Sequence, residues 1–493
     1  MNPAIPIGLI SLPLISSPLT YLTGRLLGRR SAPARWLARL VLVAAWVIFA
    51  MMVRDYADPT IFRIEGVAFR VDGLSLLFAA LSLFLGTLAV IYSGPIMAGR
   101  TGEEKYYALL LALTGTMIAL GCAADLFNLW VWFEAMVVAT YLLVVFYREK
   151  VTSLEAAVKY LVQSAIGSVL VILGIALVLA QTGTLDLAAI SAAGKPDVLV
   201  VAGVLFVLGF GVKIAIVPLH TWLPDVYSES PSGISAVMSG VVTKAGLVAL
   251  LRVLAALAGV AFSWGALLMM FGVLNIFVGN LLALRQQSIK RLLAYSSMSQ
   301  IGYMLLGIGI GIYTGESSGI QGGLFHVLNH GLMKGLAFFV VGALLYALGR
   351  TSGNEHRLTI ADLSGAARRY PLLGLAFTLA LLSLGGVPPL AGFMSKWQIF
   401  VAGLGTGTAW IDWLVIFAAL NSVLSLGYYL PVINTLFRDN PAAEWQRGRA
   451  IPLAMIGPIL VLAVLMLLIG LWPGALTWLT QPAAASLLAA FGG

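Results

Sequence analysis

Apolar runs of about 20 residues recur along nearly the whole chain, and this repetition restricts the fold more than any single motif does. Hydrophobic residues make up 60% of the sequence and charged residues only 10%, whereas soluble domains carry about 25% charged residues. A bilayer offers no water to satisfy backbone polar groups, so apolar runs of this length form helices. The sequence therefore predicts an all-α polytopic membrane protein with about fourteen transmembrane helices.

The positions of Lys and Arg predict how these helices are oriented. Loops on one side hold 20 of the 29 basic residues, and loops or helix ends on the other side hold five: Arg54, Arg63, Arg70, Lys195 and Arg252. The loop after the first segment, with Arg25, Arg29 and Arg30, belongs to the richer side. Because cytoplasmic loops are enriched in Lys and Arg, we predict a cell (inner or plasma) membrane protein with both termini outside the cytoplasm. This sorting accounts for the net charge of +9 without any nucleic-acid partner.

Four basic residues remain after this assignment, and all of them fall inside apolar segments: Lys213, Lys244, Lys334 and Lys396. Glu134 is the one acidic residue well inside such a segment. A charged side chain at bilayer depth costs several kcal/mol, so such residues usually mark a functional site. These five side chains are the first candidates for an ion path.

Proline interrupts two of the segments, which points to an internal repeat. The segment over residues 198–228 is broken after Lys213, and the segment over residues 371–403 is broken before Lys396. Breaks at matching positions in two halves are typical of inverted repeats with a site between them. We predict one transmembrane domain over residues 1–493, with helices 1–3 in residues 1–100, five-helix repeats in residues 106–257 and 263–437, broken helices 7 and 12, and a last helix at residues 451–471.

Glu134 is expected to face Lys213, because a buried carboxylate is tolerable beside a buried cation. The alternative is a structural contact between helices. Lys244 is a candidate proton carrier, and its alternative is a structural bond to a helix-end carbonyl. Lys396 would be the last station before the outer face. His220 lies in the first break and could link Lys213 to Lys244, or simply cap the broken helix.

Three titratable side chains, His326, His330 and Lys334, are spaced at i, i+4 and i+8, so they share one helix face. This spacing favours a proton relay. Two histidines at i, i+4 could also bind zinc, but no third ligand lies nearby, so we expect no metal site. The fourth histidine, His356, falls in a charged loop.

The sequence contains no motif for a redox cofactor. A single cysteine, Cys122, excludes a disulfide framework and an iron–sulfur cluster held by cysteines of this chain. No nucleotide-binding loop or flavin motif is present. We therefore expect no cofactor, and an energy source that lies in partner subunits or in an ion gradient.

Five stretches resemble the antiporter-like membrane subunits shared by respiratory complex I (NADH-quinone oxidoreductase), membrane-bound hydrogenases and Mrp Na⁺/H⁺ antiporters. They are DLFNLWVWFE, PLHTWLPDVYSESPSGISAVMSGVVTKAG, KRLLAYSSMSQIGY, HVLNHGLMKGLAFF and GGVPPLAGFMSKW. The resemblance implies fourteen helices, two inverted five-helix units and a charged axis at mid-membrane. It implies a coupling pair at Glu134 and Lys213, with the axis continuing through Lys244, His330, Lys334 and Lys396.

Some segments look most similar to the D-type Mrp component and its hydrogenase counterpart, and others to the N-type component of complex I. The short stretch after the last helix is expected to lack the long lateral helix of the largest family members. The hypothesis is a proton-translocating subunit that works with other membrane subunits in the lipid bilayer. The alternatives are a Na⁺/proton exchange module of an Mrp-type assembly and a structural membrane subunit without transport.

Overall fold

The computed structural model describes residues 1–27, 32–194, 196–350, 357–438, 445 and 447–492. Four residues discussed above, Arg29, Arg30, Lys195 and His356, lie outside this part. Within it, 11 helices are long and apolar enough to cross a membrane. The predicted count of about fourteen also includes the two interrupted helices and helix α14 (Ile289–Thr314). That exact count stays a prediction.

The elements of the N-terminal half follow the predicted segments closely. They are α1 (Ala4–Leu27), α2 (Pro33–Asp55), β1 (Thr60–Ile64), β2 (Val67–Val71), α3 (Gly73–Tyr92), α4 (Gly94–Met97), α5 (Glu103–Cys122), α6 (Leu126–Val144), α7 (Val151–Thr182), α8 (Leu187–Ala192), α9 (Val198–Ile214), α10 (Leu223–Glu229), α11 (Ser232–Val237), the π-helix η2 (Met238–Val242) and α12 (Thr243–Ala256).

The C-terminal half consists of longer helices joined by short connections. They are α13 (Trp264–Leu284), α14 (Ile289–Thr314), α15 (Ser317–Ala347), η3 (Ala361–Leu363), α16 (Ala366–Arg369), α17 (Pro371–Gly385), α18 (Ala391–Leu404), α19 (Ala409–Leu436), α21 (Leu453–Leu471), η4 (Pro473–Leu476) and α22 (Thr477–Ala490). Both predicted helix breaks are present, between α9 and α10 and between α17 and α18.

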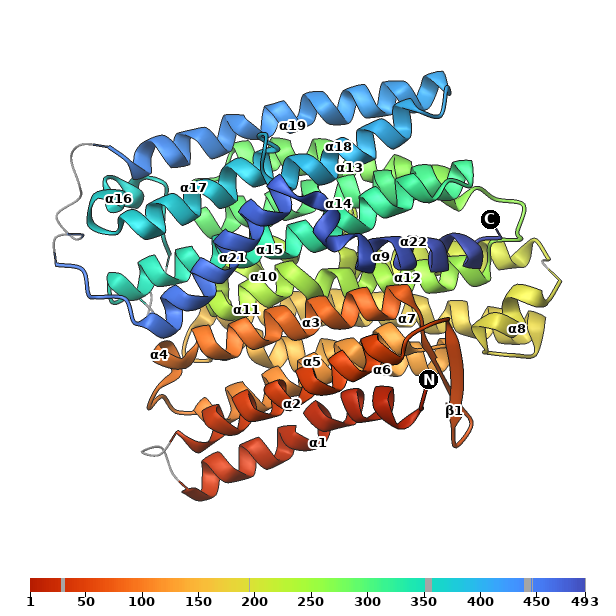
Figure 1. The fold of residues 1–493 in the computed structure, drawn as a ribbon, viewed down its shortest axis with the longest axis horizontal. Helices are drawn as coiled ribbons and strands as arrows, with labels where there is room; N and C mark the ends of the chain where they lie inside the picture. The colour runs from red at the N-terminus through yellow and green to blue at the C-terminus, as the bar shows by residue number, and fades with distance from the viewer. Residues whose placement is uncertain (28–31, 195, 351–356, 439–444, 446, 493) are drawn as a thin grey trace.

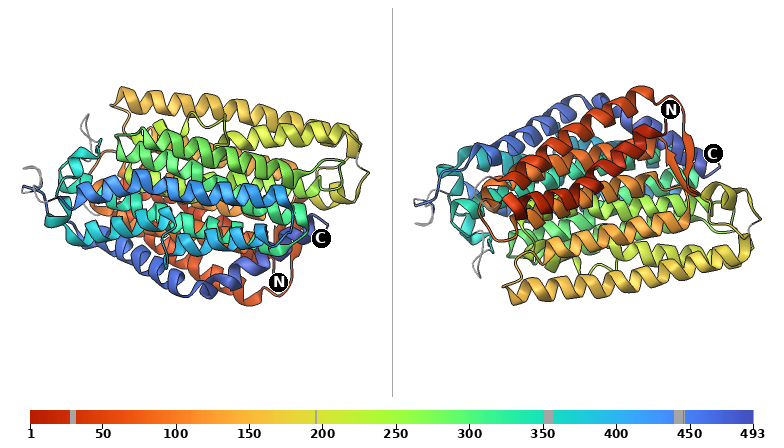
Figure 2. Two further views of the ribbon diagram at one scale, coloured as in Figure 1. Left: turned by 90° about the horizontal axis from the view of Figure 1, so that it is seen from above. Right: turned by 90° about the horizontal axis from the view of Figure 1, so that it is seen from below.

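The long helices run side by side in one bundle (Figure 1). Helix α15 lies inside it, and all residues of its most apolar window are buried. Helix α7 follows one edge of the molecule (Figure 2), where it packs on α9. The N- and C-termini lie at the same end of the bundle, together with the β1–β2 hairpin and α8 (Figure 1). Their placement at one end agrees with the predicted even number of crossings.

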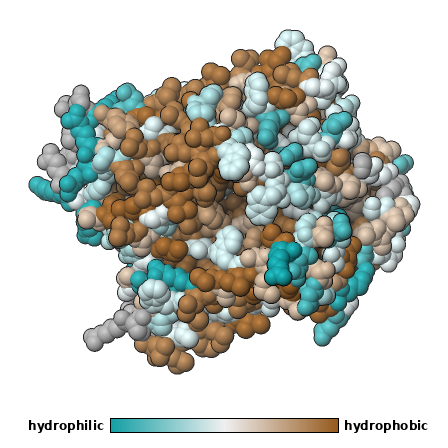
Figure 3. Space-filling model, in the orientation of Figure 1, coloured by the Kyte–Doolittle hydropathy of each residue, from teal (hydrophilic) through white to brown (hydrophobic). Residues whose placement is uncertain are grey.

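The lateral surface of the bundle is apolar, as lipid contact requires. Large hydrophobic side chains are exposed on the outer helices, including Val169, Leu375, Trp413 and Val464. Brown apolar residues cover much of the middle of the face in Figure 3, and polar residues gather toward the two ends. In water such a surface would mark an interaction site, and here it matches a membrane-embedded protein.

A short β-hairpin is added to the predicted helical fold. Strands β1 and β2 pair antiparallel, with Thr60 opposite Val71 and Ile64 opposite Val67. Their two-residue loop has positive φ at both Glu65 (48°) and Gly66 (89°), which is the turn whose twist suits a tight hairpin. The rings of Phe62 and Phe69 stack across the strands with centroids 5.7 Å apart. Alternating β-branched and aromatic residues around Glu-Gly were a readable strand signal.

Glycines let α13 and α14 approach closely. A Cβ atom on Gly302 would lie 2.4 Å from the carbonyl oxygen of Gly272, and one on Gly265 would lie 2.6 Å from the amide nitrogen of Tyr313. Contacts this short leave no room for a side chain. Glycines on both helices thus permit close helix packing at this seam.

Charged residues of the loops and helix ends form ion pairs at both ends of the bundle. Asp225 accepts from Lys159 at 3.0 Å and from Arg291 at 2.6 Å, and Glu229 accepts from Arg357 at 2.9 Å. These three cations come from the Lys- and Arg-rich set of loops. Arg63 pairs with Asp186 at the end that carries the termini. The grouping follows the sorting of basic residues made from the sequence.

Candidate functional site

A row of buried titratable side chains crosses the interior of the bundle. Lys213, Lys244, His326, His330, Lys334 and Lys396 are each 0–2% exposed. They come from α9, α12, α15 and α18, so tertiary packing brings distant segments together. Uncharged polar side chains lie between them and carry most of the hydrogen bonds.

Lys213 bonds to Tyr160 rather than to the expected glutamate. Its Nζ atom donates to the phenolic oxygen of Tyr160, a buried residue of α7. The same Nζ lies 4.6 Å from the centroid of the Tyr160 ring. Gly246 of α12 permits this packing, because a Cβ there would lie 3.1 Å from the Cβ of Lys213.

Glu134 lies near Lys213 but is not in contact with it. In the described part of the chain no ion pair within 4 Å joins the two residues, so their coupling stays a prediction. The carboxylate of Glu134 is close enough for its charge to act on the ammonium of Lys213. The buried ammonium of Lys213 needs a hydrogen-bond partner, and Tyr160 of α7 provides it. Glu134 and Lys213 thus interact through space rather than by a hydrogen bond.

Side chains satisfy the backbone groups that the first break leaves free. Helix α9 ends at Ile214, and Ala215 adopts a left-handed conformation with φ 62°. Asn275 of α13 accepts from the amide of Val217 at 2.8 Å and donates to the carbonyl of Ala215 at 3.1 Å. The indole of Trp222 donates to the carbonyl of Val212 at 2.7 Å. The break is therefore held by protein, as a membrane interior demands.

Lys244 and His330 form the central contact of the row. The Nζ atom of Lys244 lies 2.6 Å from Nδ1 of His330, and it also donates to the carbonyl of Ser239. That carbonyl belongs to η2, where the backbone bonds shift from i→i+4 to i→i+5. The wider turn leaves the Ser239 oxygen free to accept from the side chain five residues on. The predicted helix contains Lys244, but the π-turn was not foreseen.

His326 is held on both sides by neutral polar side chains. Its Nδ1 lies 2.9 Å from the hydroxyl of Ser395 and its Nε2 lies 3.0 Å from Oε1 of Gln300. The amide nitrogen of Gln300 donates to the carbonyl of Leu384 at 3.1 Å. Because the amide group of Gln300 is then oriented, its oxygen accepts and Nε2 of His326 carries the hydrogen. Both ring nitrogens are engaged by side chains that are poor metal ligands.

Lys396 bonds to the second break. Its Nζ donates to the carbonyl of Leu384 and to the hydroxyl of Ser422, each at 2.9 Å. The Leu384 carbonyl becomes available because α17 ends at Gly385, where Gly386 turns the chain with φ 81°. Lys396 and Gln300 therefore share one acceptor. This shared carbonyl connects the α15 histidine to the last lysine of the row.

Lys334 shares α15 with the two histidines, but its head group points elsewhere. It donates to the carbonyl of Leu293 at 2.7 Å and to the hydroxyl of Ser296, both on α14. His330 instead bonds to α12. The i, i+4, i+8 spacing places the three residues on one helix, and the neighbouring helices then separate their partners.

His220 has no such place in the row. It is half-buried in the turn after α9, and among the described residues no hydrogen bond joins it to Lys213 or Lys244. The structure therefore does not place His220 between the two lysines. Its role as a link stays a prediction without geometric support.

Sequence reasoning missed the uncharged members of the row. Tyr160, Asn275, Gln300, Ser395 and Ser422 are polar residues within apolar helices. Their presence in such segments was a weak signal, since buried polar groups need partners. Which charge each would meet could not be read from spacing along one helix.

Comparisons with known proteins agree with the predicted resemblance. Residues 123–425 match the family described as "NADH:quinone oxidoreductase/Mrp antiporter, TM". NADH-quinone oxidoreductase subunit N of Desulforudis audaxviator (strain MP104C) is 33% identical over 410 residues, which is 79% of this chain and 79% of that protein.

Two solved structures share the fold over nearly the full length. A chain of the membrane-bound sulfane sulfur reductase (MBS), an archaeal respiratory membrane complex, superposes with a TM-score of 0.87 at 29% identity and 98% coverage of both chains. A chain of the Mrp complex from Dietzia sp. DQ12-45-1b does so with a TM-score of 0.88 and 99% coverage of both, and at 23% identity it shows the fold alone. The likeness of some segments to the D-type Mrp component stays a prediction. This chain belongs to the NADH:quinone oxidoreductase/Mrp antiporter transmembrane family.

Proposed function

We propose that this chain is a proton-translocating subunit of a multisubunit membrane complex. The observation that carries the proposal is the buried row of lysines and histidines inside an apolar bundle. Folding alone gives no reason to keep six titratable groups out of water, because each costs free energy to bury. A proton path does give a reason to keep these groups buried.

The proposed path joins the separate hydrogen-bonded groups described above, at Lys213, at Lys244 with His330, and at His326 with Gln300. Protons enter near Lys213 and Lys244, pass to His330 and His326, and leave near Lys396. Glu134 acts on Lys213 through its charge, and Lys334 of α15 flanks the path where it bonds to α14. His220 is a secondary candidate that lies beside the entry of the path.

The two broken helices support the proposed inverted repeats, over residues 106–257 and 263–437. Lys213 precedes its break and Lys396 follows its break, the relation expected between inverted halves. Helices 1–3, in residues 1–100, and the helix over 451–471 complete the single domain over residues 1–493. Both termini are assigned to the non-cytoplasmic side of the inner or plasma membrane, because the basic loops lie at the other end.

Partner subunits supply the driving force in this proposal. The MBS chain belongs to an archaeal respiratory membrane complex and the Desulforudis relative is named as a subunit of an oxidoreductase. The same arrangement is proposed here, with other membrane subunits as neighbours. This chain itself holds no motif for redox chemistry.

A Na⁺/proton exchange module is the second candidate, favoured by the shared fold with the Mrp complex. Sodium prefers several hard oxygen ligands. Among the described residues, the carbonyls at the breaks already accept bonds: Ala215 from Asn275, and Leu384 from Gln300 and Lys396. These occupied oxygens make proton transfer the better supported function.

The test is Lys213→Ala and, separately, Glu134→Ala in the reconstituted complex. Each should lower proton translocation about tenfold or more while the complex stays assembled. Lys105→Ala, which removes an exposed lysine in the first turn of α5, is the matched control. Unchanged translocation in both variants would rule out the proposed path, and a strict requirement for Na⁺ would favour the exchange module.

A further inference from the structure

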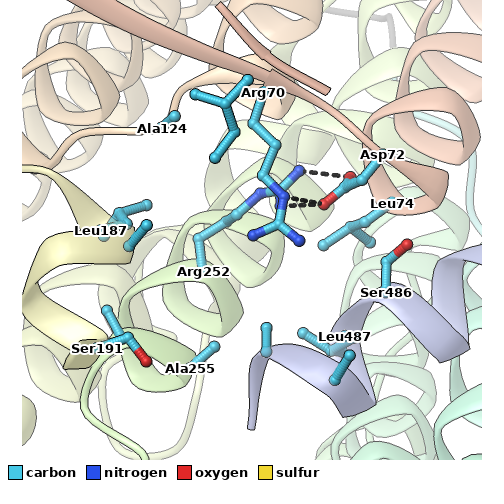
Figure 4. A pocket seen from close by; sticks show the side chains of 15 residues that line it. Arg70, Asp72, Leu74, Ala124, Leu187, Ser191, Arg252, Ala255, Ser486 and Leu487 are labelled. Carbon is cyan, nitrogen blue, oxygen red and sulfur yellow. Dashed lines mark hydrogen bonds and ion pairs between the residues drawn. The ribbon is translucent and has the colours of Figure 1, made fainter. Parts of the chain in front are cut away.

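A pocket at the end of the bundle that carries the termini has a cationic base and apolar walls. Its volume is about 280 Å³, and Arg70, Asp72 and Arg252 line its base. The walls come from α8, α12 and α22, with Leu187, Ala255 and Leu487 among them (Figure 4). None of these residues belongs to the proton path proposed above.

The charges in this pocket do not cancel. Arg252 donates to Asp72 through both terminal nitrogens, with Nη2 2.8 Å from Oδ1. Arg70 reaches the same carboxylate through Nε, 2.9 Å from Oδ2. Burial alone raises the pKa of Asp72, but the charge and hydrogen bonds of Arg252, with Arg70 and Ser75, bring it to about 2. Two guanidinium groups thus face one ionised carboxylate, which leaves a net charge of +1.

Arg70 holds the unpaired part of this charge. Figure 4 shows its two terminal nitrogens pointing into the pocket, away from Asp72. The side chain is 26% exposed, so the group is neither fully solvated nor fully paired. In the described part of the chain the Nε of Arg252 also has no hydrogen-bond partner. A guanidinium fork held in this way matches an oxyanion that presents two oxygens.

The surroundings select the kind of oxyanion. Arg63, at the same end of the bundle, is paired with Asp186, so Arg63 does not add to the positive charge of the pocket. Ala188, Ala255 and Ala489 supply small apolar surface beside the fork. The cavity is larger than a carboxylate needs, and it lies where the apolar belt of the bundle ends. A phosphodiester with one negative charge and an apolar body fits this charge and these walls.

We propose that this pocket binds a phosphate oxyanion, supplied by the head group of an anionic phospholipid of the outer leaflet. The head group would bridge Arg70 to the walls formed by α8 and α22. It would thereby tie the β-hairpin end of α3 to the C-terminal helix.

The test uses the full chain in its detergent-purified, delipidated complex, with bound lipid counted by native mass spectrometry. Phosphatidylglycerol should bind about fivefold more than phosphatidylcholine with the same acyl chains, because both carry the phosphodiester but the net positive charge of the pocket repels the choline cation. Ala188→Glu places a competing carboxylate on the exposed wall and should abolish this preference. Ala192→Glu, on the same short helix but outside the pocket, should retain it. Arg70→Gln should reduce the preference about fivefold as well.

Inorganic phosphate distinguishes the sources of the oxyanion. Displacement of phosphatidylglycerol by millimolar phosphate would show that the fork takes a free phosphate too, and retention would show that the acyl chains contribute. Equal binding of the two lipids to the wild-type complex would overturn the proposal. It would also be overturned if Ala188→Glu released a partner subunit and left lipid binding intact, since the pocket would then hold a carboxylate of that partner.

Discussion

The Nζ atom of Lys244 lies 2.6 Å from Nδ1 of His330, at the centre of the buried row. The two residues come from α12 and α15 and are 86 positions apart in the sequence. Both are fully shielded from solvent. A proton can reside on either nitrogen, so this contact is the junction between the two halves of the proposed path.

Lys244→Met and His330→Phe should each lower proton translocation about tenfold or more, because either change removes a group on which the proton can rest. The double variant should be no worse than the more impaired single variant, since both act on one step. Proton uptake by reconstituted vesicles measures this, with Lys105→Met as the control. Additive losses would mean that the two residues do not act together.

Tyr160→Phe should slow translocation about fivefold to a hundredfold. The ring and its packing stay, but the buried ammonium of Lys213 loses its acceptor, which costs about 1–3 kcal/mol. Tyr141→Phe on α6 serves as the control, because among the described hydrogen bonds none joins Tyr141 to Lys213. Wild-type rates in Tyr160→Phe would show that Lys213 works through Glu134 alone.

Gln300→Leu should impair transport about tenfold without dissociating the complex. It removes the link from His326 to the Leu384 carbonyl while keeping a similar volume in the core. Gln286→Leu makes the same chemical change and serves as the control, because the Gln286 side chain bonds only to its own helix end in the described structure. If both variants transport equally well, the α15 histidine reaches Lys396 by another route.

Gly302→Ala should destabilise the protein by about 1–3 kcal/mol, because the added methyl group would meet the Gly272 carbonyl and force α13 and α14 apart. Gly457→Ala in α21 adds the same methyl group into open space, and there the better helix propensity of Ala should be neutral or slightly stabilising. Thermal unfolding in detergent compares the two. Equal unfolding temperatures of the two variants would show that α13 and α14 can move apart to accommodate the added methyl group.

Asp72→Asn should destabilise the protein by about 2–3 kcal/mol at neutral pH. Burial opposes ionisation of Asp72, but Arg252, its hydrogen bonds and Arg70 hold the folded pKa at about 2, below the unfolded value of about 3.9. The stabilisation is therefore complete above about pH 4 and is lost as the pH falls through 2.

The pH dependence of that difference is the diagnostic measurement. Thermal unfolding at pH 7 and pH 3 should show a smaller gap between wild type and Asp72→Asn at pH 3. Asp58→Asn, at an exposed loop position before the hairpin, should match wild type at both values. A gap that does not shrink on acidification would assign the loss to packing rather than to the ion pair with Arg252.

The sequence by itself determined the class of fold and the list of charged candidates. A chain with long apolar runs can form only a few kinds of structure in a bilayer. Because a buried charge is costly however the helices pack, Lys213, Lys244, Lys334 and Lys396 are candidates from the sequence alone. Proline located both breaks because its ring and missing amide act on the local backbone. The hairpin around Glu65 and Gly66 was equally local, and its strand pattern was overlooked.

Only the tertiary structure decided which groups meet. Tyr160 rather than Glu134 bonds to Lys213, and Gln300 joins His326 to the carbonyl beside Lys396. Such choices depend on the rotation and relative height of neighbouring helices, which packing at close seams such as Gly272–Gly302 sets. Hydrogen bonds act over about 3 Å, so a small change in these positions would give every charge a different partner.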